Sequence, residues 1–125
     1  SGATTMCQFA ALPVLKNAGS ITKKINAEMK KRRDIFVHEL NKTFKTNIPK
    51  PDAGLYVFVP LKALGWKGSD SQEFCRLAIE KSGVAMVPGR AFGKEGYVRF
   101  SYGERSPILI AGIQTLAKFI KTRRS

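Results

Sequence analysis

Hydrophobic and polar positions recur with the period of an amphipathic helix in four places along the chain. The longest such segment follows a break at Asn17–Ser20 and runs from Ser20 or Thr22 to about Phe44. Its apolar side chains, which we expect to face a core, are Ile21, Ile25, Met29, Ile35, Phe36, Leu40 and Phe44. The pattern therefore predicts a long helix with a second, basic and solvated face made of Lys23, Lys24, Lys30, Lys31 and Arg33.

Three shorter helices have start and stop signals. The first covers Met6–Leu12, and we expect Pro13 to interrupt or kink it because its ring clashes with the preceding turn. The second is capped by Ser69-Asp70-Ser71 and ends at Gly83, which readily adopts a C-cap conformation. The third opens at Ser106-Pro107, since proline is well placed in a first turn. The residues expected inward in the last two helices are Phe74, Leu77, Ala78, Ile110, Ile113, Leu116, Ala117 and Ile120.

Three stretches are typical of strands. Leu55–Val59 is closed by Pro60, while Val84–Val87 and Tyr97–Tyr102 flank a loop that contains three glycines and a proline. The order helix, long helix, strand, helix, strand, strand, helix predicts an α/β (α+β) two-layer sandwich. We expect residues 1–125 to form one domain, with a sheet of three or four strands and helices packed on one side.

Arg99 lies inside the last predicted strand. Because neighbouring side chains of a strand point to opposite faces, Val98 and Phe100 should share one face. Arg99 should then lie with Tyr97 and Ser101 on the other face. A cation in this place ends at a sheet edge, binds a carboxylate of its own domain, or points into a cleft that receives an anion.

The charge of the chain leaves one alternative open. Its 22 Lys and Arg against 9 Asp and Glu give a formal net charge of +13 over 125 residues. Such a charge favours nucleic acid or other anionic partners but does not determine a fold. A basic nucleic-acid-binding module is therefore a candidate, although the aromatic residues are not interleaved with basic ones as in an RNA-recognition sheet and no helix-turn-helix spacing is present.

Several kinds of site are excluded. Cys7 and Cys75 are too few and too far apart for a disulfide framework or a zinc site, and His38 has no partner nearby in sequence, so we expect no metal. The segment Gly89–Glu95 resembles a phosphate-binding loop, but its glycine spacing is one residue short and Glu95 replaces the Ser or Thr that would hold magnesium. No apolar run is long enough to cross a bilayer, and a cytoplasmic protein without a membrane partner is expected.

Four motifs occur in order along the chain. They are Gln8-Phe9-Ala10-Ala11-Leu12, Arg32-Arg33-Asp34, Pro51-Asp52-Ala53-Gly54-Leu55-Tyr56-Val57-Phe58 and, at residues 84–102, VAMVPGRAFGKEGYVRFSY. Together they resemble the C-terminal small domain of the pyridoxal-phosphate-dependent aminotransferases of class I/II, the aspartate aminotransferase type of fold type I. That family's pattern is G-V-x-V-x-P-G-x-x-F-G followed by V-R-[LF]-S-[YF]. The resemblance implies the same two-layer fold.

The resemblance also implies roles for individual residues. Arg99 matches the arginine that binds the substrate's α-carboxylate, and its planar guanidinium suits two parallel hydrogen bonds to such a group. Tyr56 matches, more weakly, an aromatic residue near the substrate mouth; packing in the strand is its alternative role. Pro88–Gly93 would form the rim of that mouth. No catalytic or cofactor-binding residue is expected in this chain.

In this family the lysine that binds pyridoxal 5'-phosphate lies in a large domain, which is absent here. The resemblance thus implies an inactive fragment of a homodimeric transaminase whose substrates are an amino acid and a 2-oxo acid. Its small domain would close the active site, and loss of the large domain would expose apolar residues such as Tyr56 and Phe92. A β-eliminating lyase of the same superfamily is an alternative.

Overall fold

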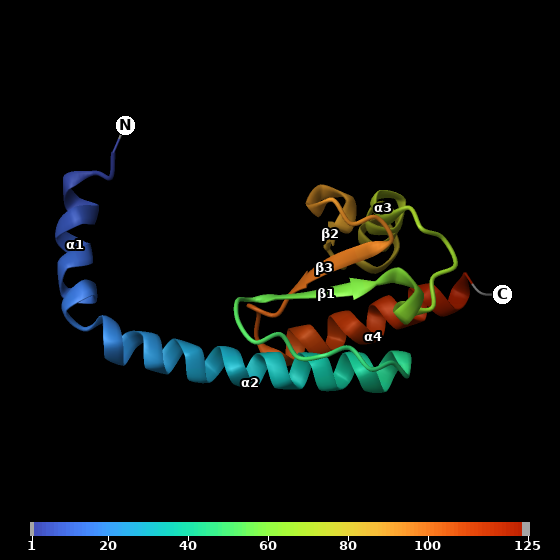
Figure 1. Cartoon of the computed structure of the whole chain (residues 1–125), viewed down its shortest axis with the longest axis horizontal. Helices are drawn as coiled ribbons and strands as arrows, with labels where there is room; N and C mark the ends of the chain where they lie inside the picture. The colour runs from blue at the N-terminus through green and yellow to red at the C-terminus, as the bar shows by residue number, and fades with distance from the viewer. Residues whose placement is uncertain (1, 124–125) are drawn as a thin grey trace.

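The computed structural model describes residues 2–123 and contains a three-stranded antiparallel sheet in the order β1-β3-β2 (Figure 1). The strands are β1 (Tyr56–Pro60), β2 (Val87–Pro88) and β3 (Tyr97–Ser101). The α-helices are α1 (Thr5–Lys16), α2 (Ala18–Phe44), α3 (Ser71–Ser82) and α4 (Ser106–Thr122). Two 3-10 turns complete the described elements, η1 (Leu61–Leu64) and η2 (Gly89–Phe92).

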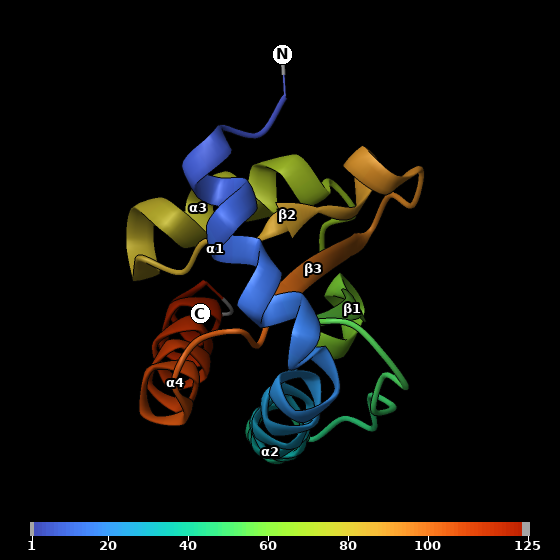
Figure 2. The same ribbon diagram turned by 90° about the vertical axis from the view of Figure 1, so that its left-hand side faces the viewer.

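The sheet and the helices form two layers. Helices α2, α3 and α4 lie on the same side of the sheet, and η2 lies next to β2 and β3, away from α2 and α4 (Figures 1 and 2). Alternation in the strands sends one set of side chains into the core: Val57, Val59, Val98 and Phe100. Between sheet and helices they meet Phe36, Leu40, Phe74 and Leu116. The predicted fold class is therefore confirmed, with three strands.

The predicted helix signals act as expected. The Asp70 carboxylate accepts hydrogen bonds from the backbone N–H groups of Gln72 and Glu73, both at 2.9 Å, and so caps α3. Gly83 ends α3 in the left-handed region with φ of +68°. Pro107 lies in the first turn of α4. Local chemistry thus determines where these helices begin and end.

Pro13 was predicted to interrupt or kink the first helix. It does not interrupt it: α1 continues through Pro13 to Lys16. Proline removes only one donor from the helical ladder. The carbonyl of Pro13 still accepts a bond from the Asn17 backbone N–H at 3.2 Å and one from the Asn17 side chain at 2.9 Å. The predicted break at Asn17–Ser20 shrinks to Asn17, and α2 begins at Ala18.

The predicted strand Val84–Val87 begins later in the structure, because β2 covers only Val87–Pro88. Only Val87 and Pro88 pair with β3. Val84 and Met86 are instead partly buried against the core, packing that does not need strand hydrogen bonds.

The long helix is buried only over its second half. Phe36, Val37 and Leu40 are its buried residues, whereas Ile25 in the predicted apolar face is 54% exposed. Helix α1 has no buried residue, and it projects with the first half of α2 away from the sheet (Figure 1). Among residues 2–123 nothing covers the apolar side chains of this projection. None of the described helices is long and apolar enough to span a membrane.

Candidate functional site

Arg99 occupies the middle of the central strand. It pairs with Phe58 of β1 on one side and with Val87 of β2 on the other. Its neighbours Val98 and Phe100 are buried in the core, so Arg99 belongs to the opposite sheet face, which none of the described helices covers. The predicted division of the strand into two faces is confirmed.

Aromatic rings hold the Arg99 guanidinium. Its central carbon lies 4.1 Å from the centre of the Tyr56 ring and 4.4 Å from that of Phe92. Cation–π contacts of this kind contribute about 0.5–1 kcal/mol each at exposed sites. These contacts use none of the guanidinium's N–H groups as hydrogen-bond donors to an oxygen, so those groups stay available for hydrogen bonds.

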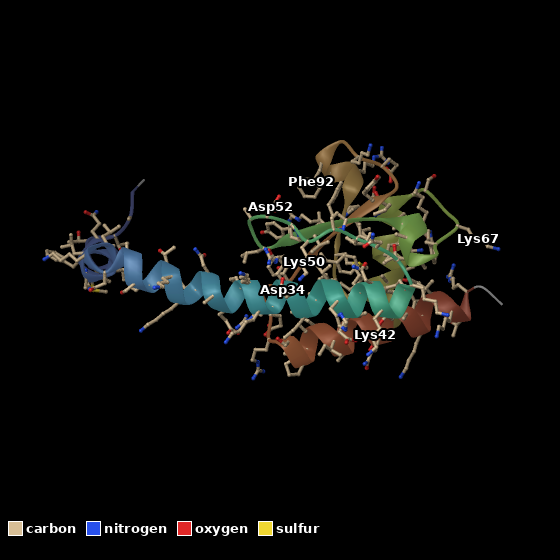
Figure 3. All side chains as sticks on the ribbon, turned by 60° about the horizontal axis from the view of Figure 1, so that its bottom comes forward. Asp34, Lys42, Lys50, Asp52, Lys67 and Phe92 are labelled. Carbon is tan, nitrogen blue, oxygen red and sulfur yellow. The ribbon has the colours of Figure 1, made fainter. Side chains whose placement is uncertain are left out.

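Two further rings extend this surface. Phe58 stacks on Tyr97 with 5.1 Å between ring centres and meets Phe92 edge-on at 6.1 Å. Phe92 lies in η2, on the side of the molecule away from Asp34 and Lys42 of α2 (Figure 3). We call the open side of the sheet formed by Tyr56, Phe58, Phe92, Tyr97 and Arg99 the aromatic face.

Arg99 has no ion pair and no side-chain hydrogen bond to any residue in the 2–123 range. Other arginines are engaged within the chain: Arg33 donates to Asp34 and to the Pro51 carbonyl, and Arg76 bridges two glutamates of α3. The alternative of a salt bridge within the domain is thus not what the structure contains. A half-buried cation without an anion is a ready site for an anionic ligand.

The guanidinium borders a hollow of about 150 Å³. Its lining residues are Tyr56, Ala85, Met86, Val87, Arg99 and Ser101. A larger hollow of about 330 Å³ lies between α2 and residues 52–54, but its arginine, Arg33, is the one already bound to Asp34. The smaller hollow is therefore the better candidate for carboxylate binding.

The η2 turn is placed by a close backbone approach at Gly89. A Cβ atom at this position would collide with the Lys94 carbonyl oxygen and come within 2.6 Å of the Tyr97 carbonyl oxygen. The Lys94 backbone N–H donates to the Gly89 carbonyl at 3.0 Å, which closes the turn. Only glycine, which has no Cβ, allows this close approach. The resulting tight turn carries Phe92 beside β3.

Glu95 and Ser71 join this turn to α3. The Glu95 carboxylate accepts hydrogen bonds from the backbone N–H groups of Ser71 at 2.7 Å and Gly96 at 3.1 Å. Hydrogen bonds from Ser71, followed by that from Gly96 and the charge of Arg90, hold the pKa of Glu95 below its usual value. The carboxylate that argues against a magnesium-dependent phosphate loop thus serves as an anchor for the loop.

Tyr102 fixes the start of β1. Its hydroxyl donates to the Gly54 carbonyl at 2.7 Å, and its backbone N–H donates to the Leu55 carbonyl at 3.0 Å. The side chain is buried, and burial raises its pKa. These bonds place Leu55 and hence Tyr56 beside the end of β3.

The other residues considered from sequence lie away from the aromatic face. His38 is exposed on α2, and Cys7 is exposed on α1. Cys75 is buried in α3, where desolvation raises the pKa of its thiol to about 11. Within residues 2–123 no three His, Cys, Asp or Glu side chains cluster as metal ligands would. Lys23, Lys24, Lys30 and Lys31 are exposed on α2, whereas Arg33 is not part of that solvated stripe.

The aromatic face by itself does not fit pyridoxal 5'-phosphate. That cofactor needs a lysine amine, an acidic partner for its ring nitrogen and donors for its phosphate. Among the residues of this face there is no carboxylate, and nearby Lys94 packs on the Tyr97 ring, 5.3 Å from its centre. A cofactor site would need residues other than those of the aromatic face.

Comparison with known proteins identifies the family of this chain. The family model "Aminotransferase class I and II" matches residues 2–110. The chain belongs to the class I and II aminotransferases. Enzymes of this family depend in general on pyridoxal 5'-phosphate, and the sequence resemblance is confirmed.

Relatives match this chain over part of their own length. It is 33% identical over 123 residues to the probable aspartate/prephenate aminotransferase of Aquifex aeolicus, covering 97% of this chain and 31% of that protein. It is 37% identical over 105 residues to a probable aspartate aminotransferase of Methanocaldococcus jannaschii, covering 82% and 26%. The solved aromatic aminotransferase of Pyrococcus horikoshii superposes with a TM-score of 0.79 at 30% identity, covering 94% and 31%. The chain therefore spans less than a third of these relatives, consistent with the C-terminal small domain of an aminotransferase.

Sequence reasoning missed part of the site. Tyr97 was expected on the face of Arg99, but Phe58 was seen only as a strand residue, although its two-residue spacing from Tyr56 places it on that same face. The contact of Phe92 with the guanidinium and the bond between Glu95 and Ser71 left no local signal, because each joins separate elements.

Proposed function

We propose that this chain is the small domain of an aminotransferase that moves an amino group between an amino acid and a 2-oxo acid, and that Arg99 binds the substrate's α-carboxylate. The observation that carries the proposal is a guanidinium without an anionic partner in the described chain, packed on Tyr56 and Phe92 beside a small hollow. Its chemistry is complementary to a carboxylate.

The rings restrict the guanidinium plane, so less freedom is lost when two parallel N–H···O bonds form. A carboxylate held in this way fixes the orientation of the adjacent Cα and its amino group. This chain's contribution is thus positioning. Bond breaking at Cα requires pyridoxal 5'-phosphate, an electron acceptor that the residues described here do not hold.

The cofactor would be supplied by a large domain elsewhere in the full-length protein. Two uncovered apolar regions are the surfaces that such a domain would cover: the aromatic face, where Tyr56 is 46% exposed, and α1, where Phe9 is 68% exposed. Carboxylate binding by Arg99 would pull the small domain towards the large one and exclude water. A homodimer of such chains is part of the proposal. Without the large domain, the 125-residue chain should not turn over.

Substitution of Arg99 tests this role. In the full-length protein, Arg99→Lys should lower kcat/KM for amino acids by at least about 100-fold, because a point charge cannot replace a bidentate fork. The absorbance of the bound cofactor should not change. Arg90→Lys is the matched control, since the Arg90 side chain is exposed on η2, outside the aromatic face, and this variant should retain activity. Normal turnover by Arg99→Lys would refute the carboxylate role.

The reaction products separate the related enzyme classes. An aminotransferase transfers nitrogen to a second 2-oxo acid, whereas a β-eliminating lyase releases ammonia. We expect a new amino acid to form from the 2-oxo acid, and release of ammonia in its place would contradict the proposal. The family match also favours this reaction over a nucleic-acid-binding role for the basic chain.

A further inference from the structure

One buried hydroxyl connects α3 with the turn that carries Phe92. Ser71 is the fully buried polar side chain of the described residues, at the first position of α3. Its Oγ accepts a hydrogen bond from the Arg90 backbone N–H at 3.3 Å. Burial of a hydroxyl is unfavourable unless it is hydrogen-bonded, so this contact should persist in the folded chain.

Glu95 completes the connection from the other end of the turn. Its carboxylate accepts from the Ser71 backbone N–H at 2.7 Å, although the two residues are 24 positions apart in sequence. That N–H is one of the free donors at the N-terminal end of α3, where the helix dipole also favours a negative charge. We call the bonds among Ser71, Arg90 and Glu95 the α3 clasp. The clasp holds η2 on both sides of Phe92.

Phe92 depends on this turn for its position. Its ring is 48% exposed, and its ring contacts are to Arg99 and Phe58. Such a half-exposed side chain has little packing of its own, so the backbone of η2 decides where the ring lies. A shift of η2 would separate Phe92 from the guanidinium and leave Tyr56 as the remaining ring on Arg99.

We propose that Ser71 and Glu95 are positioning residues for the substrate-binding arginine: the α3 clasp holds Phe92 on Arg99 and thereby restricts the guanidinium to the orientation that receives a carboxylate. The proposal rests on the carboxylate role of Arg99 proposed above. Neither Ser71 nor Glu95 touches the substrate in this account. Their loss should raise KM rather than lower kcat, because the bond-breaking groups are elsewhere.

Nuclear magnetic resonance of the 125-residue chain tests the geometry directly. Ring currents from Tyr56 and Phe92 should shift the Arg99 Nε–Hε resonance, and Phe92→Leu gives the value expected when the Phe92 ring is removed. Ser71→Ala and Glu95→Ala should move the resonance towards that value. Glu80→Ala is the control: it removes a carboxylate from the same helix, while Arg76 keeps its bond to Glu73 at 2.8 Å. If Glu95→Ala does not fold, Glu95→Gln, which keeps the shape, replaces it.

Kinetics of the full-length protein supply the second readout. Loss of one cation–π contact corresponds to a rise in KM for the amino acid of about two- to fivefold, with kcat little changed. Resonances and KM that stay at the wild-type values in both Ser71→Ala and Glu95→Ala would overturn the clasp. If the resonance moves but Arg99→Lys keeps full activity, the clasp stands as a structural device and the carboxylate role fails.

Discussion

The Arg99 guanidinium packs on Tyr56 across a diagonal of the sheet, 4.1 Å from the ring centre, although the register pairs Arg99 with Phe58 and Tyr56 with Ser101. Long side chains on neighbouring antiparallel strands can reach such diagonal neighbours. The arginine therefore leans along β3 towards its end. This direction brings the cation to the hollow that Tyr56 and Ser101 also border.

Tyr56 should act through its ring. Tyr56→Leu removes the cation–π contact, worth about 0.5–1 kcal/mol, and should raise KM for the amino acid about two- to fivefold in the full-length protein. Tyr56→Phe keeps the ring and serves as the control. If Tyr56→Phe is as defective as Tyr56→Leu, the hydroxyl rather than the ring is the functional group.

Gly89 should tolerate no side chain. Gly89→Ala places a Cβ against the carbonyl oxygens of Lys94 and Tyr97, neither of which can move without opening the turn. We expect a loss of about 2 kcal/mol or more in the free energy of unfolding, measured by urea titration of the chain.

Gly112→Ala is the matched control for that substitution. Gly112 lies within α4, and a Cβ there would make only an ordinary 4.0 Å contact with Val84. This variant should gain about 0.5–1 kcal/mol, since alanine is the better helix former. Equal effects of the two substitutions would show that Gly89 is not sterically required.

The two cysteines should differ in reactivity. Cys75 is buried with a thiol pKa of about 11, so at pH 7 it stays protonated and should resist thiol-specific reagents in the folded chain, whereas exposed Cys7 should react. The raised pKa also means that folding favours the thiol over the thiolate. Stability should fall as pH rises from the unfolded value, about 9, towards about 11. Rapid labelling of both cysteines at pH 7 would contradict the burial of Cys75.

The projecting helix should be the least protected part of the chain. Helix α1 buries no residue, and a helix of 12 residues is marginal alone in water. In hydrogen exchange its amides should exchange nearly as fast as in an unfolded chain, while those of α4, with Leu116 and Ile120 buried, should exchange orders of magnitude more slowly. Strong protection of α1 in the 125-residue chain would mean that something, such as a second copy, covers it.

Features that depend on neighbouring residues were predictable. The cap at Asp70, the stop at Gly83 and the division of β3 into a buried and an open face follow from side-chain chemistry and backbone period within a few residues. Arg99 lies at the arginine position of the family motif, which is also a local feature. These features were predictable because their causes lie close together in the sequence.

The amino-acid sequence alone determined the two-layer fold, the order of its elements and the arginine on the open face, because the periods of helices and strands are local properties. The tertiary structure decided which predicted apolar faces are covered, that β2 is short, and that Phe92 and Tyr56 hold Arg99. It also decided the bond from Glu95 to Ser71, 24 residues away. Such contacts depend on where distant segments meet, and no local pattern encodes that meeting point.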